Sequence, residues 1–86
     1  MNTEDVCKPG TKEAVILDML ALDADTLIVD LFAKAYGGRP APIMREQQQI
    51  IGKRISQINK KLGEHGLSIR PGEARYSYRL YRQSSR

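Results

Sequence analysis

The sequence predicts an α+β domain in which three helices are followed by a carboxy-terminal β-hairpin. Apolar residues recur every three or four positions between residues 12 and 63, as they do on one face of a helix. Between residues 67 and 81 they alternate with polar residues, which is the period of a half-buried strand. The chain has 86 residues, too few for a second core. We therefore expect one domain over residues 11–82, a flexible arm over 1–10 and a flexible tail over 83–86.

The first two helices are expected over residues 12–22 and 26–36. The Thr11 hydroxyl can accept a hydrogen bond from a free backbone N–H of the first turn, so Thr11 is the expected N-cap of the first helix. Gly37-Gly38 follows the second helix, and glycine readily takes the left-handed conformation that ends many helices. Residues 39–42, which read Arg-Pro-Ala-Pro, then form a short, stiff connection.

The third helix, over residues 43–63, is the longest of the three. Its apolar residues lie within about 60° of one another on a helical wheel and predict a core stripe. This stripe consists of Ile51, Ile55, Ile58 and Leu62. Gly52 weakens the middle of the helix by about 1 kcal/mol relative to alanine. Three interpretations of Gly52 are open. It can form a packing notch against a crossing helix, which is the interpretation we favour. It can also mark a break into two helices or allow close approach to a phosphate.

A β-hairpin completes the predicted fold. A short strand over residues 67–70 and a longer one over 75–81 flank a Pro-Gly turn over 71–74. The expected inner face of the longer strand consists of Tyr76, Tyr78 and Leu80. His65 lies at the end of the third helix, where a histidine usually compensates the helix dipole or acts as a cap.

The net charge of +4 is divided unevenly along the chain. Residues 1–42 carry four basic and seven acidic residues, a balance of −3. Residues 43–86 carry ten basic and three acidic residues, a balance of +7. Such an uneven distribution of charge can reflect a solvated surface alone. It also suits a protein with one face directed at a polyanion.

Several classes of function are excluded by the residues present. The single Cys7 and single His65 provide too few ligands for a Cys/His metal site, and Cys7 cannot form an internal disulfide. We find no paired acid and base, no nucleophile beside a histidine and no glycine loop for phosphate. We therefore expect no enzyme activity, no cofactor and no small-molecule ligand.

The same residues predict a protein of the cytoplasm rather than of a membrane. The first ten residues are polar and acidic, unlike a secretory signal. The most apolar stretch, from Ala14 to Tyr36, is interrupted by four aspartates, each of which costs about 2.5 to 3.5 kcal/mol in a bilayer. The lone cysteine is also typical of a reducing compartment.

Three helices followed by a basic hairpin is the element order of a winged helix-turn-helix, whose third helix enters the major groove of DNA. The third helix carries a polar face opposite its core stripe, and the hairpin tip lies between two arginines. Glutamine can pair with adenine, lysine with guanine or phosphate, and serine with either. The candidate DNA-binding residues are Arg45, Gln49, Lys53, Ser56, Gln57 and Lys60 in the helix, with Arg70 and Arg75 in the wing.

The carboxy-terminal part also resembles a known family. The stretch from Ile55 to Leu62 is similar to the recognition helix of OmpR/PhoB-type response regulators, and Tyr78-Arg79-Leu80 is similar to their closing wing strand, with Ile69 in the preceding strand. The resemblance covers about residues 43–82 and implies a winged-helix fold with a DNA-facing helix. No receiver domain of that family is evident, so phosphorylation control is not implied. The amino-terminal sheet of the family is not evident either. Ser77 and Arg75 stand where the family has wing glycines.

We therefore expect a sequence-specific protein of bacterial or phage type that binds double-stranded DNA. Its expected role is transcription regulation for a phage, plasmid or integrative element, or an architectural role in recombination. Other partners are a second copy of the chain, as a homodimer, or RNA polymerase. Two alternatives remain: a protein-interaction module on the same scaffold, and RNA binding through tyrosines of the hairpin, of which Tyr81 is the best placed.

Overall fold

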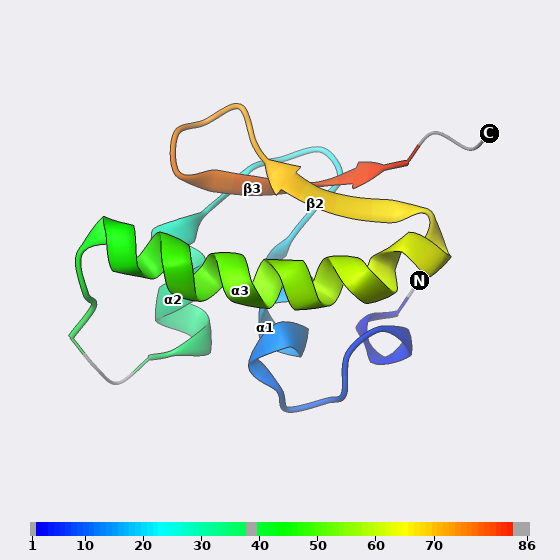
Figure 1. Ribbon diagram of the computed structural model, residues 1–86, viewed down its shortest axis with the longest axis horizontal. Helices are drawn as coiled ribbons and strands as arrows, with labels where there is room; N and C mark the ends of the chain where they lie inside the picture. Colours follow the sequence, from blue (N-terminus) through cyan, green and yellow to red (C-terminus); the bar gives the residue numbers. More distant parts are fainter. Residues whose placement is uncertain (1, 38–39, 84–86) are drawn as a thin grey trace.

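The computed structural model describes residues 2–37 and 40–83, and it confirms an α+β architecture (Figure 1). The helices are α1 (Lys12–Met19), α2 (Ile28–Ala35) and α3 (Met44–Leu62). The strands are β1 (Thr26–Leu27), β2 (Leu67–Pro71) and β3 (Ser77–Arg82). Two short 3-10 turns, η1 (Thr3–Asp5) and η2 (Gly63–His65), precede α1 and follow α3. Gly38 and Arg39, in the expected connection before α3, lie outside the described residues.

The sheet has three antiparallel strands in the order β1-β3-β2, so the expected hairpin is joined by a strand that the sequence pattern did not reveal. In the β2–β3 hairpin Ile69 pairs with Leu80, and between β1 and β3 Thr26 pairs with Tyr78. The second helix consequently begins at Ile28 and not at residue 26. Two residues are too few to show an alternating pattern, so only their pairing with β3 identifies them as a strand.

The first helix ends at Met19, three residues earlier than expected. Leu20 is extended, with ψ of 148°, and the Ala21 carbonyl accepts a hydrogen bond from the Leu80 N–H at 3.1 Å. The Thr26 hydroxyl donates to the free Met19 carbonyl at 3.0 Å. The end of the helix is therefore decided by contacts with distant segments and not by helix propensity.

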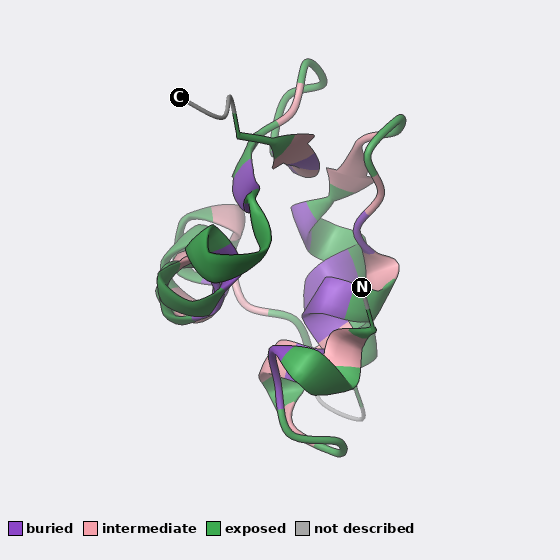
Figure 2. Cartoon of the chain, turned by 90° about the vertical axis from the view of Figure 1, so that its right-hand side faces the viewer, coloured by how far each residue is buried: buried purple, intermediate pink, exposed green. Residues whose placement is uncertain are grey.

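The core lies between α3, the other two helices and the inner face of the sheet, where Figure 2 shows the buried residues facing one another. The expected stripe of α3 is confirmed, because Ile51, Ile55, Ile58 and Leu62 are all buried. The helix is continuous from Met44 to Leu62, so the interpretation of Gly52 as a break into two helices is wrong.

The amino-terminal segment packs against this core instead of forming a free arm. Val6 and Cys7 are buried, and the Thr3 hydroxyl donates a hydrogen bond to the Asp18 carboxylate of α1. Burial raises the pKa of the Cys7 thiol, which favours its neutral form. Of the expected carboxy-terminal tail only Gln83 is described, and its N–H donates to the Gly66 carbonyl at 2.9 Å.

The turn of the hairpin is longer than predicted and occupies residues 72–76. Tyr76 takes a left-handed conformation, with φ of 57°, and is 39% exposed, so its expected place on the inner face is wrong. Tyr78 and Leu80 do contact the core, as expected. The Tyr76 carbonyl accepts a hydrogen bond from the Ile28 N–H at 2.8 Å, which ties the turn to the start of α2.

Asn59 joins α3 to the outer edge of the sheet. Its amide oxygen accepts from the Ile69 N–H at 2.7 Å, and its amide nitrogen donates to the Ile69 carbonyl at 3.0 Å. The Asn59→Ala variant leaves both buried backbone groups without partners. We expect its free energy of unfolding, measured by urea denaturation, to fall by about 1–3 kcal/mol. Gln57→Ala removes the same amide from an exposed site of the same helix and should change stability by less than about 0.5 kcal/mol; equal losses would contradict this role of Asn59.

Candidate nucleic-acid interface

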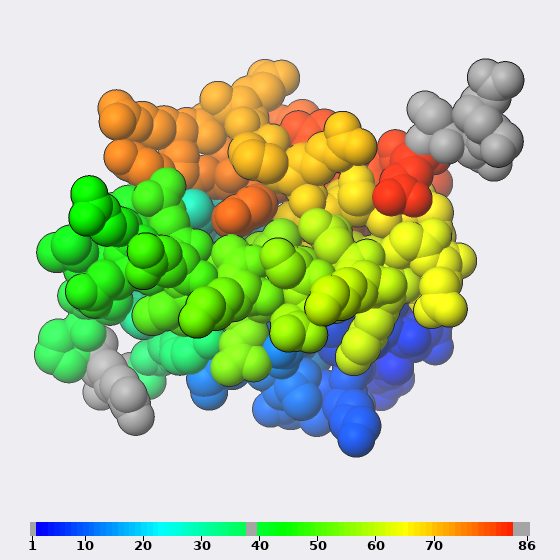
Figure 3. All heavy atoms as spheres, viewed as in Figure 1, coloured from blue at the N-terminus to red at the C-terminus, as the bar shows by residue number. Residues whose placement is uncertain are grey.

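All eight predicted DNA-binding residues are exposed. Six lie on α3, Arg70 lies in β2 and Arg75 lies in the hairpin turn. The residues at spacings of three and four share one face of α3, opposite the core stripe. This row consists of Gln49, Lys53, Ser56 and Lys60. In the face seen in Figure 3, α3 crosses the molecule and the hairpin lies along its upper edge, so both elements can meet one ligand.

Side-chain contacts on both flanks hold α3 in this rotation. On one flank Arg54 donates to the Glu13 carboxylate of α1 at 2.7 Å and to the Tyr36 hydroxyl after α2 at 2.9 Å. The hydrogen bond from Arg54 lowers the pKa of Glu13, so this carboxylate is ionised at neutral pH. On the other flank Asn59 binds β2. The polar row therefore points outward because both sides of the helix are occupied.

The structure reduces the charge available on the candidate nucleic-acid face. Arg54 and Arg79 are engaged in ion pairs with acidic residues of the amino-terminal half, Glu13 and Asp25. Glu46 is exposed in the first turn of α3, three residues before Gln49, so the outer face is not free of acids at its beginning. The face is polar and cationic chiefly from Gln49 onward.

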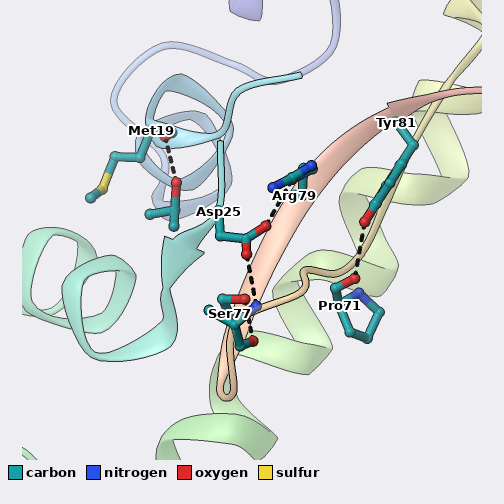
Figure 4. A network of polar contacts seen from close by, with 8 residues as sticks. Met19, Asp25, Pro71, Ser77, Arg79 and Tyr81 are labelled. Carbon is teal, nitrogen blue, oxygen red and sulfur yellow. Dashed lines mark hydrogen bonds and ion pairs between the residues drawn. The ribbon is translucent and has the colours of Figure 1, made fainter. Parts of the chain in front are cut away.

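Asp25 organises the hairpin turn, which lies below it in Figure 4. Its carboxylate accepts from the Ala74 N–H at 2.8 Å and from the Arg79 guanidinium at 2.7 Å. The Ser77 hydroxyl donates to the Ala74 carbonyl at 2.6 Å, and the Gly72 N–H donates to the Ser77 carbonyl at 3.0 Å. The hydrogen bond from Ala74, then the Arg79 guanidinium, lowers the pKa of Asp25. The turn is thus held in one shape by an ionised carboxylate.

Arg75 lies at the tip of this turn. Its guanidinium lies over the Tyr76 ring, 4.9 Å from the ring centre. A stacked guanidinium keeps its charge and leaves its edge free to bind an anion. The sequence indicated Arg75 as a wing residue, but neither the stacking on its neighbour nor the role of Asp25 was predictable, because Asp25 is 49 residues from Ala74.

No cluster of three or more potential metal ligands occurs within residues 2–37 and 40–83. None of the helices described is both long and apolar enough to cross a bilayer.

Comparison of the chain with protein-family models, with curated proteins and with solved structures finds no significant match.

Proposed function

We propose that this protein binds double-stranded DNA in a sequence-specific manner and regulates transcription. In this proposal α3 enters the major groove and the β2–β3 hairpin contacts the neighbouring backbone or minor groove as a wing. The outward row of Gln49, Lys53, Ser56 and Lys60 on a helix fixed at both flanks is the observation that carries it.

The architecture supports a winged helix-turn-helix of this kind. The longest helix is supported by two shorter ones, and the hairpin that follows it folds back along its flank (Figure 1). With 19 residues α3 is about 28 Å long, and a major groove about 12 Å wide admits one helix. The short β1 completes the sheet at the edge opposite β2, where it pairs with the first two residues of β3 next to the hairpin turn.

The chemistry of the exposed residues suits both base and phosphate contacts. The amides of Gln49 and Gln57 can pair with adenine, and the ammonium groups of Lys53 and Lys60 can contact guanine or phosphate. Arg75 at the wing tip can reach a phosphate or the minor groove. Neutralised phosphates release counterions, so binding should weaken steeply with salt.

The test is a Lys53→Ala/Lys60→Ala double variant, assayed on duplexes selected by the wild-type protein from a random DNA pool. We expect its affinity to fall at least about tenfold in 0.1 M salt. The slope of log affinity against log salt concentration should become shallower by about two, because two cationic contacts are lost. Circular dichroism should show an unchanged fold, since both side chains are exposed.

The matched control is Lys8→Ala/Lys34→Ala, which removes the same charge from the amino-terminal segment and from α2. If affinity depends on position and not on net charge, this variant should bind nearly as the wild type does. Wild-type affinity in the Lys53/Lys60 variant would refute the assignment of α3 as the recognition helix.

A protein-interaction module on the same scaffold is the second candidate. Leu22, Leu27 and Val29, in the half of the chain that carries the negative balance, are each 41% exposed. Ile43, the first residue of the other half, is 67% exposed. This function would be favoured if the wild type bound no duplex at low salt and sedimented as an oligomer. A monomer that binds duplex would exclude it.

A further inference from the structure

Gly52 occupies a position in the middle of α3 where glycine is unfavourable relative to alanine. Among the described residues, a Cβ at this position would meet only the Tyr78 hydroxyl oxygen, at 3.9 Å, which is an ordinary van der Waals distance. The packing of the protein therefore leaves room for alanine, and the interpretation of Gly52 as an internal packing notch is not supported. Packing among the described residues gives no reason for glycine at this position.

The Tyr78 hydroxyl is the side-chain group that lies beside Gly52. Tyr78 extends from β3 toward α3, packs partly against the core and ends beside Gly52. Burial is the one cause that raises the pKa of Tyr78, and no hydrogen bond from the described residues contributes to it. The hydroxyl is consequently protonated at neutral pH and has a hydrogen bond to donate.

This hydroxyl belongs to a groove between α3 and the hairpin turn, which we call the wing groove. The groove has a volume of about 310 Å³. Its lining includes Gln48 of α3, Tyr78 and the turn residues Glu73, Arg75 and Tyr76. Four of these side chains can donate hydrogen bonds, whereas Glu73 brings a negative charge to the rim. The donors come from α3, from β3 and from the turn. Gly52 does not line the groove but adjoins it through the Tyr78 hydroxyl.

We propose that the wing groove binds a phosphate of the DNA backbone, with Tyr78 as hydrogen-bond donor and Gly52 as the gap through which the strand approaches. The proposal rests on the DNA-binding function above and names a contact outside the exposed row of α3. Tyrosine hydroxyls and arginines are common phosphate ligands, and such contacts set the register of a protein on the duplex without reading sequence. A methyl group at residue 52 would lie beside the hydroxyl and obstruct the phosphate.

Two single variants test this proposal. Gly52→Ala should raise Tm by about 4 °C, because it removes a helix-weakening glycine without a clash, yet it should lower duplex affinity at least about tenfold. Tyr78→Phe should lower affinity about fivefold, and equally for selected and random duplexes, because a phosphate contact carries no sequence information. The double variant should lose little more than Gly52→Ala alone, since both changes remove the same contact.

Gly63→Ala is the matched control. Gly63 also has a helical conformation, with φ of −54°, and a Cβ there would meet nothing within 4 Å among the described residues. Its replacement should stabilise the protein without reducing affinity. Glu73→Gln should strengthen binding by removing the negative charge from the rim.

Each contrary result has its own meaning. A more stable Gly52→Ala variant that binds duplex as tightly as the wild type would overturn the wing groove and leave the DNA-binding function standing. A lower Tm for Gly52→Ala would show that the fold itself needs glycine and would also overturn the inference. Absence of duplex binding by the wild type would overturn both proposals.

Discussion

Replacement of Gly72 by alanine is expected to lower the free energy of unfolding by about 3 kcal/mol, the upper end of the range for an overpacked site. A Cβ on Gly72 would overlap the Asp25 carboxylate and lie 2.6 Å from the Ser77 hydroxyl oxygen. To make room, Asp25 must leave its hydrogen bonds to Ala74 and Arg79, and the hairpin turn loses its anchor. Urea denaturation followed by circular dichroism measures the loss.

A double-mutant cycle identifies the cause. In an Asp25→Ala background the carboxylate is absent, so Gly72→Ala should cost clearly less than it does in the wild type. Equal costs in the two backgrounds would show that the overlap with Asp25 is not responsible. Gly63→Ala, at a position with open space, serves as the benign glycine substitution.

The pH dependence of the Asp25→Ala variant provides an independent check. The folded-state pKa of Asp25 lies below the ordinary value of 3.8, so the carboxylate stabilises the fold at neutral pH. This contribution is lost as the pH falls below 3.8 and passes through the lowered pKa of the folded protein. The stability difference between wild type and Asp25→Ala should therefore shrink in acid, and a constant difference would contradict the role of the charge.

Ile51→Ala is the second large effect, with an expected loss of about 3–4 kcal/mol. Ile51 is 0% exposed, is the first residue of the α3 stripe, and belongs to the cluster that joins all three helices and the sheet. Small domains have only a few kcal/mol of stability, so this single change removes much of it. Thermal and urea unfolding both measure the loss.

Two further substitutions bracket this prediction. Ile43→Ala makes the same chemical change at a residue that is 67% exposed, just before α3, and should cost less than about 0.5 kcal/mol. Ile51→Val should cost about 1 kcal/mol and remains measurable if Ile51→Ala does not fold. Similar losses at Ile51 and Ile43 would be incompatible with the burial described.

The elements with a strong local pattern were predicted well. The stripe from Ile51 to Leu62 repeats over more than three turns, so both the helix and its buried face followed from spacing alone. Thr11 was also predicted as a cap, and its hydroxyl accepts from the Ala14 N–H at 3.2 Å. The strands of the hairpin were placed to within one or two residues, because the change of period is visible in the sequence.

The elements that depend on distant partners were predicted poorly. The strand Thr26–Leu27 exists because β3 pairs with it, and α1 ends at Met19 because the chain turns to the sheet edge. Val6 and Cys7 are buried although the first ten residues read as a polar arm. In each case the stabilising contact joins residues that a local pattern cannot connect.

The sequence by itself determined that α3 has a buried face and an opposite polar face, since helical spacing fixes both together. Only the tertiary structure decided which charges remain free for a ligand. Arg54 and Arg79 are held by Glu13 and Asp25, and both pairs bridge segments more than 40 residues apart. The reason is physical: hydrophobic periodicity is a local property of the chain, whereas ion pairs form wherever folding brings opposite charges together.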